Sequence, residues 1–159
     1  LINNAGVLPS RGAFQDSSLD DIDQMVEVNL KAPLRLTRSL LPSMIERKRG
    51  HIFFVGSSAG RAPHPGAAAY GATKAGVISL TKNLARGLAP VRVNAIAPGA
   101  VNSSWQIEWT PEARQGSIDK AALKRRCEPE DLAEVIVFLG FGASMVTGQT
   151  IVVDGGLTL

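Results

Sequence analysis

Apolar side chains recur at a mostly helical spacing in the stretch that follows Ser18. Ser18 and Asp21 resemble a capping box in which Asp replaces Glu, and this pair marks the start of a helix. The apolar positions behind this start are Ile22, Met25, Val26, Leu30, Leu34 and Leu41. The pattern predicts one long helix that reaches about Lys48 and is bent or interrupted at Pro33 and Pro42.

Short apolar runs alternate with helical patterns along the rest of the chain. The runs 51–55, 91–97 and 150–153 are rich in strand formers and are typical of buried parallel strands. Helical patterns cover residues 68–88 and the stretch that opens at Pro129. Strands that alternate with helices of this length predict βαβ units. The expected fold class is therefore α/β, a doubly wound, Rossmann-like parallel sheet with helices on both faces.

The chain begins inside one of the predicted strands. Leu1 is not a Met, and Leu1-Ile2 runs at once into Asn3-Asn4-Ala5-Gly6. We therefore expect residues 1–159 to be a single partial Rossmann-like domain whose N-terminal strands are missing from this chain.

Composition narrows the class of protein. A chain of 159 residues with 45% hydrophobic and 19% charged residues has an ordinary globular balance. The net charge of +3 arises from 17 basic and 14 acidic residues, and the clusters at 46–49 and 124–126 are expected to be solvated helix ends rather than a nucleic-acid site. We find no apolar run of about 18 residues and no metal-ligand spacing, so neither a membrane span nor a metal site is expected. The single Cys127 favours a reducing compartment, and the expected location is the cytoplasm.

The chemistry centres on Tyr70 and Lys74, which are four residues apart and so share one face of the predicted helix. A cation about 6 Å from a phenol, at an effective dielectric near 20, favours the phenolate by about 2.8 kcal/mol, or roughly two pKa units. The pKa of Tyr70 is thus predicted to fall from about 10 toward a range useful for acid/base catalysis. Ser57, which ends the second strand, can hold a substrate oxygen while Tyr70 exchanges its proton.

Asn29 lies four residues before Pro33 inside the first helix. Because Pro33 has no N–H, the helical hydrogen bond to the carbonyl of Asn29 cannot form. We expect that carbonyl to be free.

Four patterns together resemble the short-chain dehydrogenase/reductase family. They are Asn3-Asn4-Ala5-Gly6 after a strand, Asn29 in the first helix, Ser57 at a strand end and Tyr70-Gly71-Ala72-Thr73-Lys74 thirteen residues beyond Ser57. Pro98-Gly99, Thr147-Gly148-Gln149 and Asp154-Gly155-Gly156 complete the resemblance, which covers essentially the whole chain. Among the relatives, the chain looks most like 3-oxoacyl-carrier-protein reductases and sugar or polyol dehydrogenases.

The resemblance implies a function and a set of roles. It implies an NAD(P)-dependent oxidoreductase that moves a hydride between a nicotinamide cofactor and a carbonyl or alcohol substrate, with Tyr70 as the general acid/base. It also implies that Asn29 holds a water that links Lys74 to a proton relay. The catalytic set is therefore expected to be Asn29, Ser57, Tyr70 and Lys74. The family further implies a homo-oligomer that uses the apolar faces of the two long helices.

The resemblance also assigns cofactor contacts. Asn4, Ala5 and Gly6 would line the adenosine side, Tyr70 and Lys74 would bind the nicotinamide ribose, and Pro98, Gly99 and Val101 would border the nicotinamide. Ser103 stands where many relatives carry Thr beside the carboxamide. The Gly-rich turn for the pyrophosphate and the residues that select NAD or NADP would lie upstream of Leu1, so the expected cofactor is NAD or NADP.

Two other functions are weighed against this one. Gly56-Ser57-Ser58-Ala59-Gly60 fits the nucleophile elbow of a hydrolase, but only His64 follows Ser58, no acidic residue lies between them, and Pro63 and Pro65 block the helix that an elbow requires. The second alternative is a truncated, inactive relative that acts as an oligomerising or binding module. The substrate is expected to be set by residues 100–127, which are polar and irregular and predict no element.

Overall fold

The computed structural model describes residues 1–103, 105 and 109–159. Its sheet contains four parallel strands in the order β1-β2-β3-β4, each beside the next. The strands are β1 (Ile2–Asn3), β2 (His51–Val55), β3 (Arg92–Pro98) and β4 (Thr150–Val153). The three predicted apolar runs are therefore strands, and because all strands are parallel, their carboxyl ends meet at one edge of the sheet.

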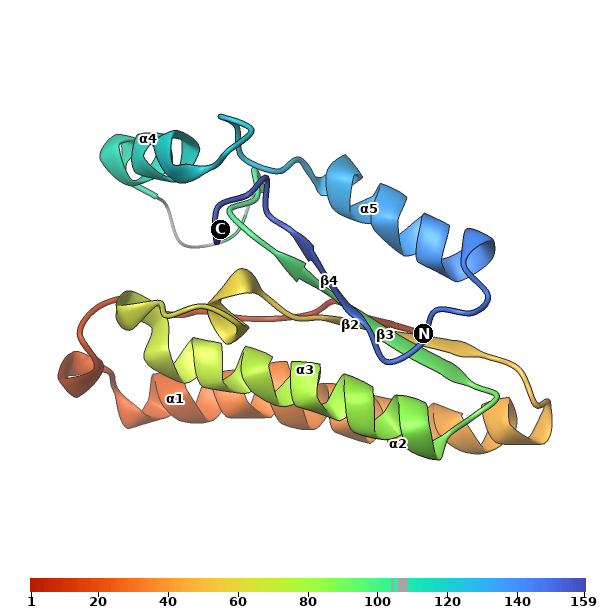
Figure 1. Cartoon of the computed structure of the whole chain (residues 1–159). Coiled ribbons are helices and arrows are strands. Elements are labelled where there is room, and N and C mark those ends of the chain that lie inside the picture. Colours follow the sequence, from red (N-terminus) through yellow and green to blue (C-terminus); the bar gives the residue numbers. More distant parts are fainter. Residues whose placement is uncertain (104, 106–108) are drawn as a thin grey trace.

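Helices cover both faces of this sheet (Figure 1). The helices are α1 (Leu19–Val26), α2 (Ala32–Glu46), α3 (Ala68–Gly87), α4 (Pro111–Lys120) and α5 (Pro129–Val137). Helices α1, α2 and α3 lie on one side, and α5 lies on the other. The predicted α/β class, a Rossmann-like parallel sheet with two helical layers, is confirmed.

Successive side chains of β2 point to opposite faces of the sheet and form part of the core on each face. Ile52 and Phe54 point to one face, where they pack with Val77 of α3 and Met44 of α2. Phe53 points to the other face and packs with Leu139, just beyond α5. Each face of the strand is thus buried, as the unbroken apolar run predicts.

The first long helix begins as predicted, and its regular α-helical geometry is interrupted just before Pro33. The hydroxyl of Ser18 accepts a hydrogen bond from the amide of Asp21 at 3.0 Å, which caps α1. A wider π-helical turn, η2 (Glu27–Lys31), joins α1 to α2 just before Pro33, and it accommodates a residue that has no N–H to donate. Helix α2 continues through Pro42, so the helix is not interrupted there, and a bend at Pro42 stays a prediction.

Helix α4 is the element that the sequence did not predict. The hydroxyl of Thr110 caps it by accepting from the amide of Ala113 at 3.2 Å, and Pro111 occupies its first turn. Its ten residues carry no apolar stripe, so periodicity gave no sign of a helix.

Arg92 fastens the end of α5 to the sheet. Its guanidinium donates to the carbonyl oxygens of Leu139 and Ala143, both at 2.9 Å, and to that of Gly140 at 3.0 Å. These carbonyls belong to the π-helical turn η5 (Phe138–Gly142) and the residue after it, where helical C=O groups lack partners. A cation at a helix C-terminus is also favoured by the helix dipole.

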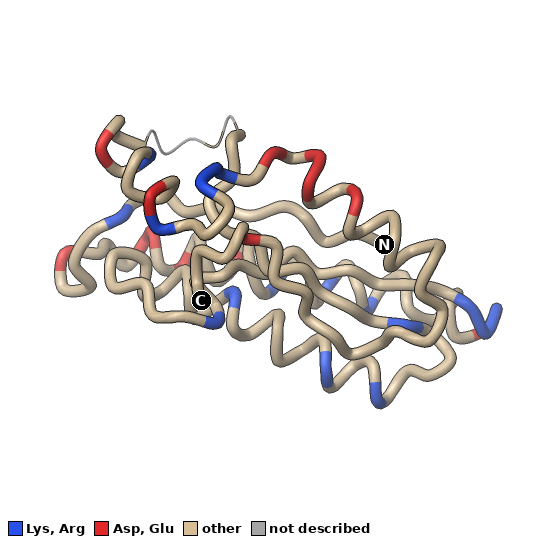
Figure 2. Tube along the Cα trace, turned by 45° about the horizontal axis from the view of Figure 1, so that its top comes forward, with Lys and Arg blue, Asp and Glu red and all other residues tan. Residues whose placement is uncertain are grey.

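The surface charges are distributed without one basic face. Acidic residues gather along α5, whereas Lys and Arg are spread over the trace (Figure 2). None of the helices in the described part of the chain is both long and apolar enough to cross a membrane.

Candidate active site

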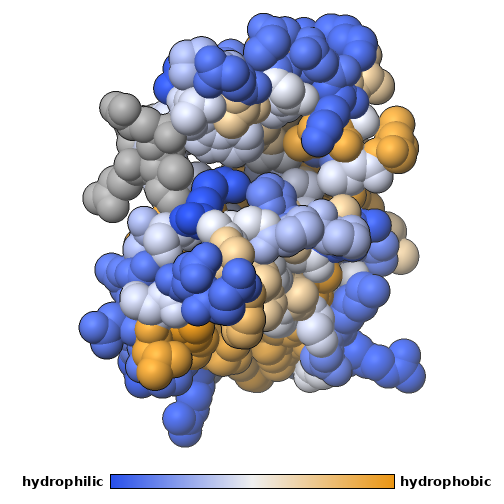
Figure 3. Space-filling view, turned by 90° about the vertical axis from the view of Figure 1, so that its left-hand side faces the viewer, coloured by the Kyte–Doolittle hydropathy of each residue, from blue (hydrophilic) through white to orange (hydrophobic). Residues whose placement is uncertain are grey.

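The site lies where the carboxyl ends of the strands meet, on the side of the molecule that Figure 3 faces, and most residues on that side are hydrophilic. Ser57 follows β2 and caps the short 3-10 turn η3 (Ser58–Gly60), with its Oγ accepting from the amide of Ala59 at 3.2 Å. This turn packs directly on the first turns of α3. A Cβ added at Gly71 would lie 2.7 Å from the carbonyl oxygen of Ala59, so only glycine permits this approach. The contact fixes Ser57 against the helix that carries Tyr70.

Tyr70 is 6% exposed and packs with Leu8 and Met25. Burial raises the pKa of its phenol, while a hydrogen bond with the Ser57 hydroxyl and the positive charge of Arg11 lower it by less. The predicted fall of this pKa under the charge of Lys74 is therefore wrong for this structure. The desolvation of a buried phenolate outweighs the nearby positive charge, so Tyr70 is a neutral proton donor at pH 7.

Lys74 is 4% exposed, which is rare for an ammonium group. Its Nζ donates to the carbonyl oxygen of Val55 at 2.8 Å and lies 5.6 Å from the centroid of the Tyr70 ring. Burial lowers the pKa of Lys74 to about 8. A Cβ added at Gly6 would lie 3.2 Å from this Nζ, so a larger residue at position 6 would crowd the ammonium.

Asn29, 2% exposed, joins three segments through its side chain. Its Oδ1 accepts from the amide of Val7 at 2.7 Å, and its Nδ2 donates to the carbonyl oxygen of Val7 at 2.8 Å and to the hydroxyl of Thr73 at 3.3 Å. The hydroxyl of Thr73 in turn donates to the carbonyl of Tyr70 at 2.7 Å. Asn29 lies in the π-helical turn η2, and the expected free state of its carbonyl stays a prediction.

Apart from Tyr70 and Lys74 on α3, the residues predicted to contact the cofactor lie at or just beyond the carboxyl ends of β1 and β3. Asn4 and Ala5 are exposed after β1, and Gly6 is half-buried beside Lys74 and Asn29. After the buried Pro98 at the end of β3, the chain places Gly99 and Val101 half-buried and Ser103 exposed. Dinucleotides bind outside the carboxyl ends of strands in open α/β sheets, so this is the edge at which these contacts would form.

Aromatic and basic residues outside the predicted site complete the surroundings. Among them is Arg126, which is half-buried and donates to the carbonyl oxygen of Val101, so the prediction that the cluster 124–126 is a solvated helix end is wrong for this residue. The ring of Trp105 lies edge-on to Tyr70 with centroids 5.8 Å apart. The guanidinium of Arg11 lies 4.9 Å from the centroid of the Trp109 ring, and that of Arg126 lies 5.0 Å from it. Nearly a hundred residues separate Arg11 from Trp109 in the chain, so no local pattern could have joined them.

Neither a hydrolase nor a metal centre is supported by the geometry. Ser58 opens a three-residue 3-10 turn rather than the helix that follows a nucleophile elbow. Among the residues that the structure describes, no group of three His, Cys, Asp or Glu side chains could hold a metal ion.

The chain is similar to known proteins in both sequence and structure. Residues 1–158 match the model of a protein family described as enoyl-(acyl carrier protein) reductase. The chain is 37% identical to human dehydrogenase/reductase SDR family member 4, with 98% of this chain and 58% of that protein covered. It is 38% identical to the 3-oxoacyl-(acyl-carrier-protein) reductase FabG of Thermotoga maritima, with 100% of this chain and 65% of that protein covered. The chain thus spans 58% to 65% of the length of these relatives.

Solved structures share the fold over nearly the whole chain. A 3-ketoacyl-(acyl-carrier-protein) reductase from Brucella melitensis, complexed with NADH, superposes with a TM-score of 0.92 at 34% identity, covering 100% of this chain and 66% of that one. A protein named ElxO, with NADP bound, superposes with a TM-score of 0.91 at 28% identity, covering 99% of this chain and 66% of that one.

The contacts of Asn29 generate a first prediction. Asn29→Leu removes the partners of both backbone groups of Val7, and leaving these groups unpaired costs about 2–4 kcal/mol of unfolding free energy. We expect this loss in urea unfolding, together with faster hydrogen exchange at the Val7 amide. Asn83→Leu is the matched control, because Asn83 is exposed on α3 and its side chain donates to the carbonyl oxygen of Ser79 in the same helix. Slow exchange at Val7 in the Asn29→Leu variant would contradict the role assigned to this side chain.

Proposed function

The chain belongs to the short-chain dehydrogenase/reductase family, and on that basis we propose that the complete protein is an NAD(P)-dependent oxidoreductase. It transfers a hydride between a nicotinamide cofactor and a carbonyl or alcohol substrate. One observation carries the proposal: a buried phenol, Tyr70, lies beside the hydroxyl of Ser57 and the buried ammonium of Lys74 at the carboxyl edge of a parallel sheet. We treat residues 1–159 as one partial Rossmann-like domain of that enzyme.

The residues at this edge fit an anionic dinucleotide. Lys74 presents a buried cation toward Gly6, at a place where no side chain intervenes. We assign Asn4, Ala5 and Gly6 to the adenosine side, Tyr70 and Lys74 to the nicotinamide ribose, and Pro98, Gly99, Val101 and Ser103 to the nicotinamide. NAD or NADP, when bound, supplies or accepts the hydride. The NADH and NADP reported with the two solved structures support this assignment.

Residues of the protein itself supply the proton that the substrate oxygen takes up. The phenol of Tyr70 is neutral at pH 7, because burial raises its pKa, so its hydroxyl donates a proton to the oxygen of a carbonyl substrate as negative charge develops there. The hydroxyl of Ser57 donates a hydrogen bond to the same oxygen and holds it in place. The positive charge of Lys74 favours the phenolate that remains, since an opposite charge stabilises the ionised form.

The side chain of Asn29 positions the residues around Tyr70 and Lys74. Its side chain holds Val7 and Thr73, and Thr73 is bonded to the backbone of Tyr70. The loop that carries Gly6 and the helix that carries Tyr70 and Lys74 are therefore fixed relative to each other. The relay water that the family implies would sit at the carbonyl of Asn29.

We also assign the protein to the cytoplasm. Its single cysteine, Cys127, is a free, buried thiol, which suits a reducing compartment. Fractionation of the source cells that found the protein outside the cytoplasm would overturn this assignment.

The complete protein is further proposed to be a homo-oligomer that uses the outer faces of α2 and α3. Helix α2 exposes Leu36 and Leu40, at 45% and 41%, and α3 exposes the small side chains of Ala72 and Ala75. Light scattering at micromolar concentration should give at least a dimer, and Ala75→Arg should dissociate it because a charge cannot be buried unpaired in such a contact. Glu130→Arg on α5 serves as the control. A monomeric wild-type protein would contradict the proposal.

The proton-transfer role of Tyr70 is tested by Tyr70→Phe in the complete protein. The change removes the proton donor and one oxygen atom, so we expect turnover to fall about a hundredfold or more while folding is retained. Steady-state rates with NADH and NADPH measure the loss, and circular dichroism checks the fold. A folded Phe variant that keeps more than about a tenth of wild-type turnover would remove Tyr70 from the mechanism.

A further inference from the structure

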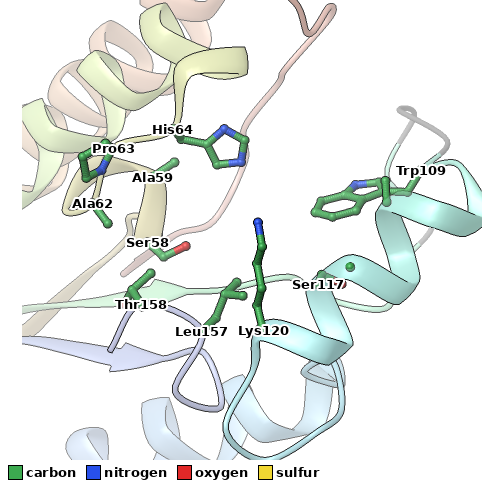
Figure 4. A pocket seen from close by; sticks show the side chains of 12 residues that line it. Ser58, Ala59, Ala62, Pro63, His64, Trp109, Ser117, Lys120, Leu157 and Thr158 are labelled. Carbon is green, nitrogen blue, oxygen red and sulfur yellow. The ribbon is translucent and has the colours of Figure 1, made fainter.

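A cavity of about 340 Å³ opens beside the proposed catalytic residues (Figure 4). One wall is the η3 turn, with Ser58 next in the chain to Ser57, and it continues to His64. The opposite wall is α4 with Trp109 before it, and Leu157 and Thr158 near the C-terminus close the floor. None of the cofactor contacts proposed above lines this cavity. The cavity is therefore placed to receive a molecule that extends away from Ser57.

Among the described residues that line this cavity, the one with a charged side chain is Lys120. Lys120, at the end of α4, extends its side chain into the space between His64 and Trp109 (Figure 4). No Asp or Glu is among the described residues that line the cavity, and no ion pair of Lys120 occurs within the described part of the chain. Arg11 adds a second cation, with its guanidinium over the Trp109 ring.

The protonation state of His64 also bears on which ligands this cavity can bind. Burial lowers the pKa of His64, and the positive charges of Arg11 and Lys120 lower it further. His64 is therefore neutral at pH 7 and adds a polar group without competing for an anion. A concave site that holds the cation of Lys120, with Arg11 nearby, attracts negative charge, and low-dielectric walls strengthen that attraction.

We propose that the substrate carries an anionic group, a carboxylate or a phosphate ester, and that the ammonium of Lys120 binds it in this cavity. The inference rests on the proposed function, because it assigns the substrate class of the same site. The volume is at the lower end for small-molecule sites, about 300–1,000 Å³, so the substrate is a small oxo or hydroxy compound. Lys120 is then a specificity-determining residue rather than a participant in proton transfer.

The test compares matched charged and neutral substrates in the complete protein. The first pair is 4-oxopentanoate and its methyl ester, and the second is hydroxyacetone phosphate and hydroxyacetone. We expect kcat/KM to favour the charged member of one pair by about 10- to 100-fold, the range of a charge-assisted hydrogen bond. The pair that shows the preference identifies the anion as a carboxylate or a phosphate ester.

Lys120→Met should abolish this preference by raising KM for the charged substrate while leaving KM for the neutral one unchanged. Lys124→Met is the matched control, because Lys124 donates to the backbone carbonyl of Asp119 and does not line the cavity. A wild-type enzyme without charge preference, or a Lys120→Met variant that keeps the preference, would overturn the inference.

A binding measurement separates this inference from the proposed function. The sequence contains two tryptophans, and one of them, Trp109, lines the cavity, so tryptophan fluorescence reports its occupation. We expect saturable quenching by 4-oxopentanoate or hydroxyacetone phosphate in the wild type, and weakening of about 10-fold or more in Lys120→Met. Such quenching without turnover of any substrate would refute the oxidoreductase but uphold the anion site. Turnover of a substrate, with equal quenching in the wild type and in Lys120→Met, would uphold the oxidoreductase but refute the anion site.

Discussion

The burial of one ammonium group, that of Lys74, is the constraint around which this part of the molecule is arranged. A buried charge is costly unless hydrogen bonds or an opposite charge compensate it. Here the carbonyl of Val55 at the end of β2 supplies one hydrogen bond, and burial lowers the pKa to about 8. Gly6 leaves space for the ammonium, and Gly60 lets the η3 turn lie against the backbone of Lys74. The end of β2, the loop that carries Gly6 and the η3 turn therefore all meet at the side chain of Lys74.

The electrostatics of the site extend outward from this group. Arg11 lies close enough to affect the pKa of both Tyr70 and His64, and Lys120 extends into the adjoining cavity. Positive charges thus stand on the proposed cofactor side and on the proposed substrate side of Tyr70. In the proposed reaction, such a field stabilises the negative charge that develops on a substrate oxygen, and it favours the anionic ligands proposed for both sides.

The sequence predicted those features that depend on local pattern. The strands predicted at 51–55 and 91–97 and helix α3 follow from unbroken apolar runs and helical spacing. The resemblance to the family was carried by four patterns, at residues 3–6, Asn29, Ser57 and residues 70–74. The features that it missed depend on tertiary burial. The pKa of Tyr70 is raised because desolvation outweighs the charge that a helical spacing brings near. The partners of the Asn29 side chain, on Val7 and Thr73, lie 22 and 44 residues away, and α4 is too polar to show a helical period.

The ionisation of Lys74 tests the account most directly, because the site as described requires this ammonium to be buried. Carbon-13 labelling of the lysine ε-carbons, with Lys74→Arg to assign the signal, allows its pKa to be measured by NMR titration. The structure predicts a pKa of about 8 for Lys74, so its charge is lost as the pH rises through that value, well before the ordinary lysines titrate. A Lys74 signal that titrates near 10.5, the ordinary lysine value, would show that the ammonium is solvated and would contradict the account.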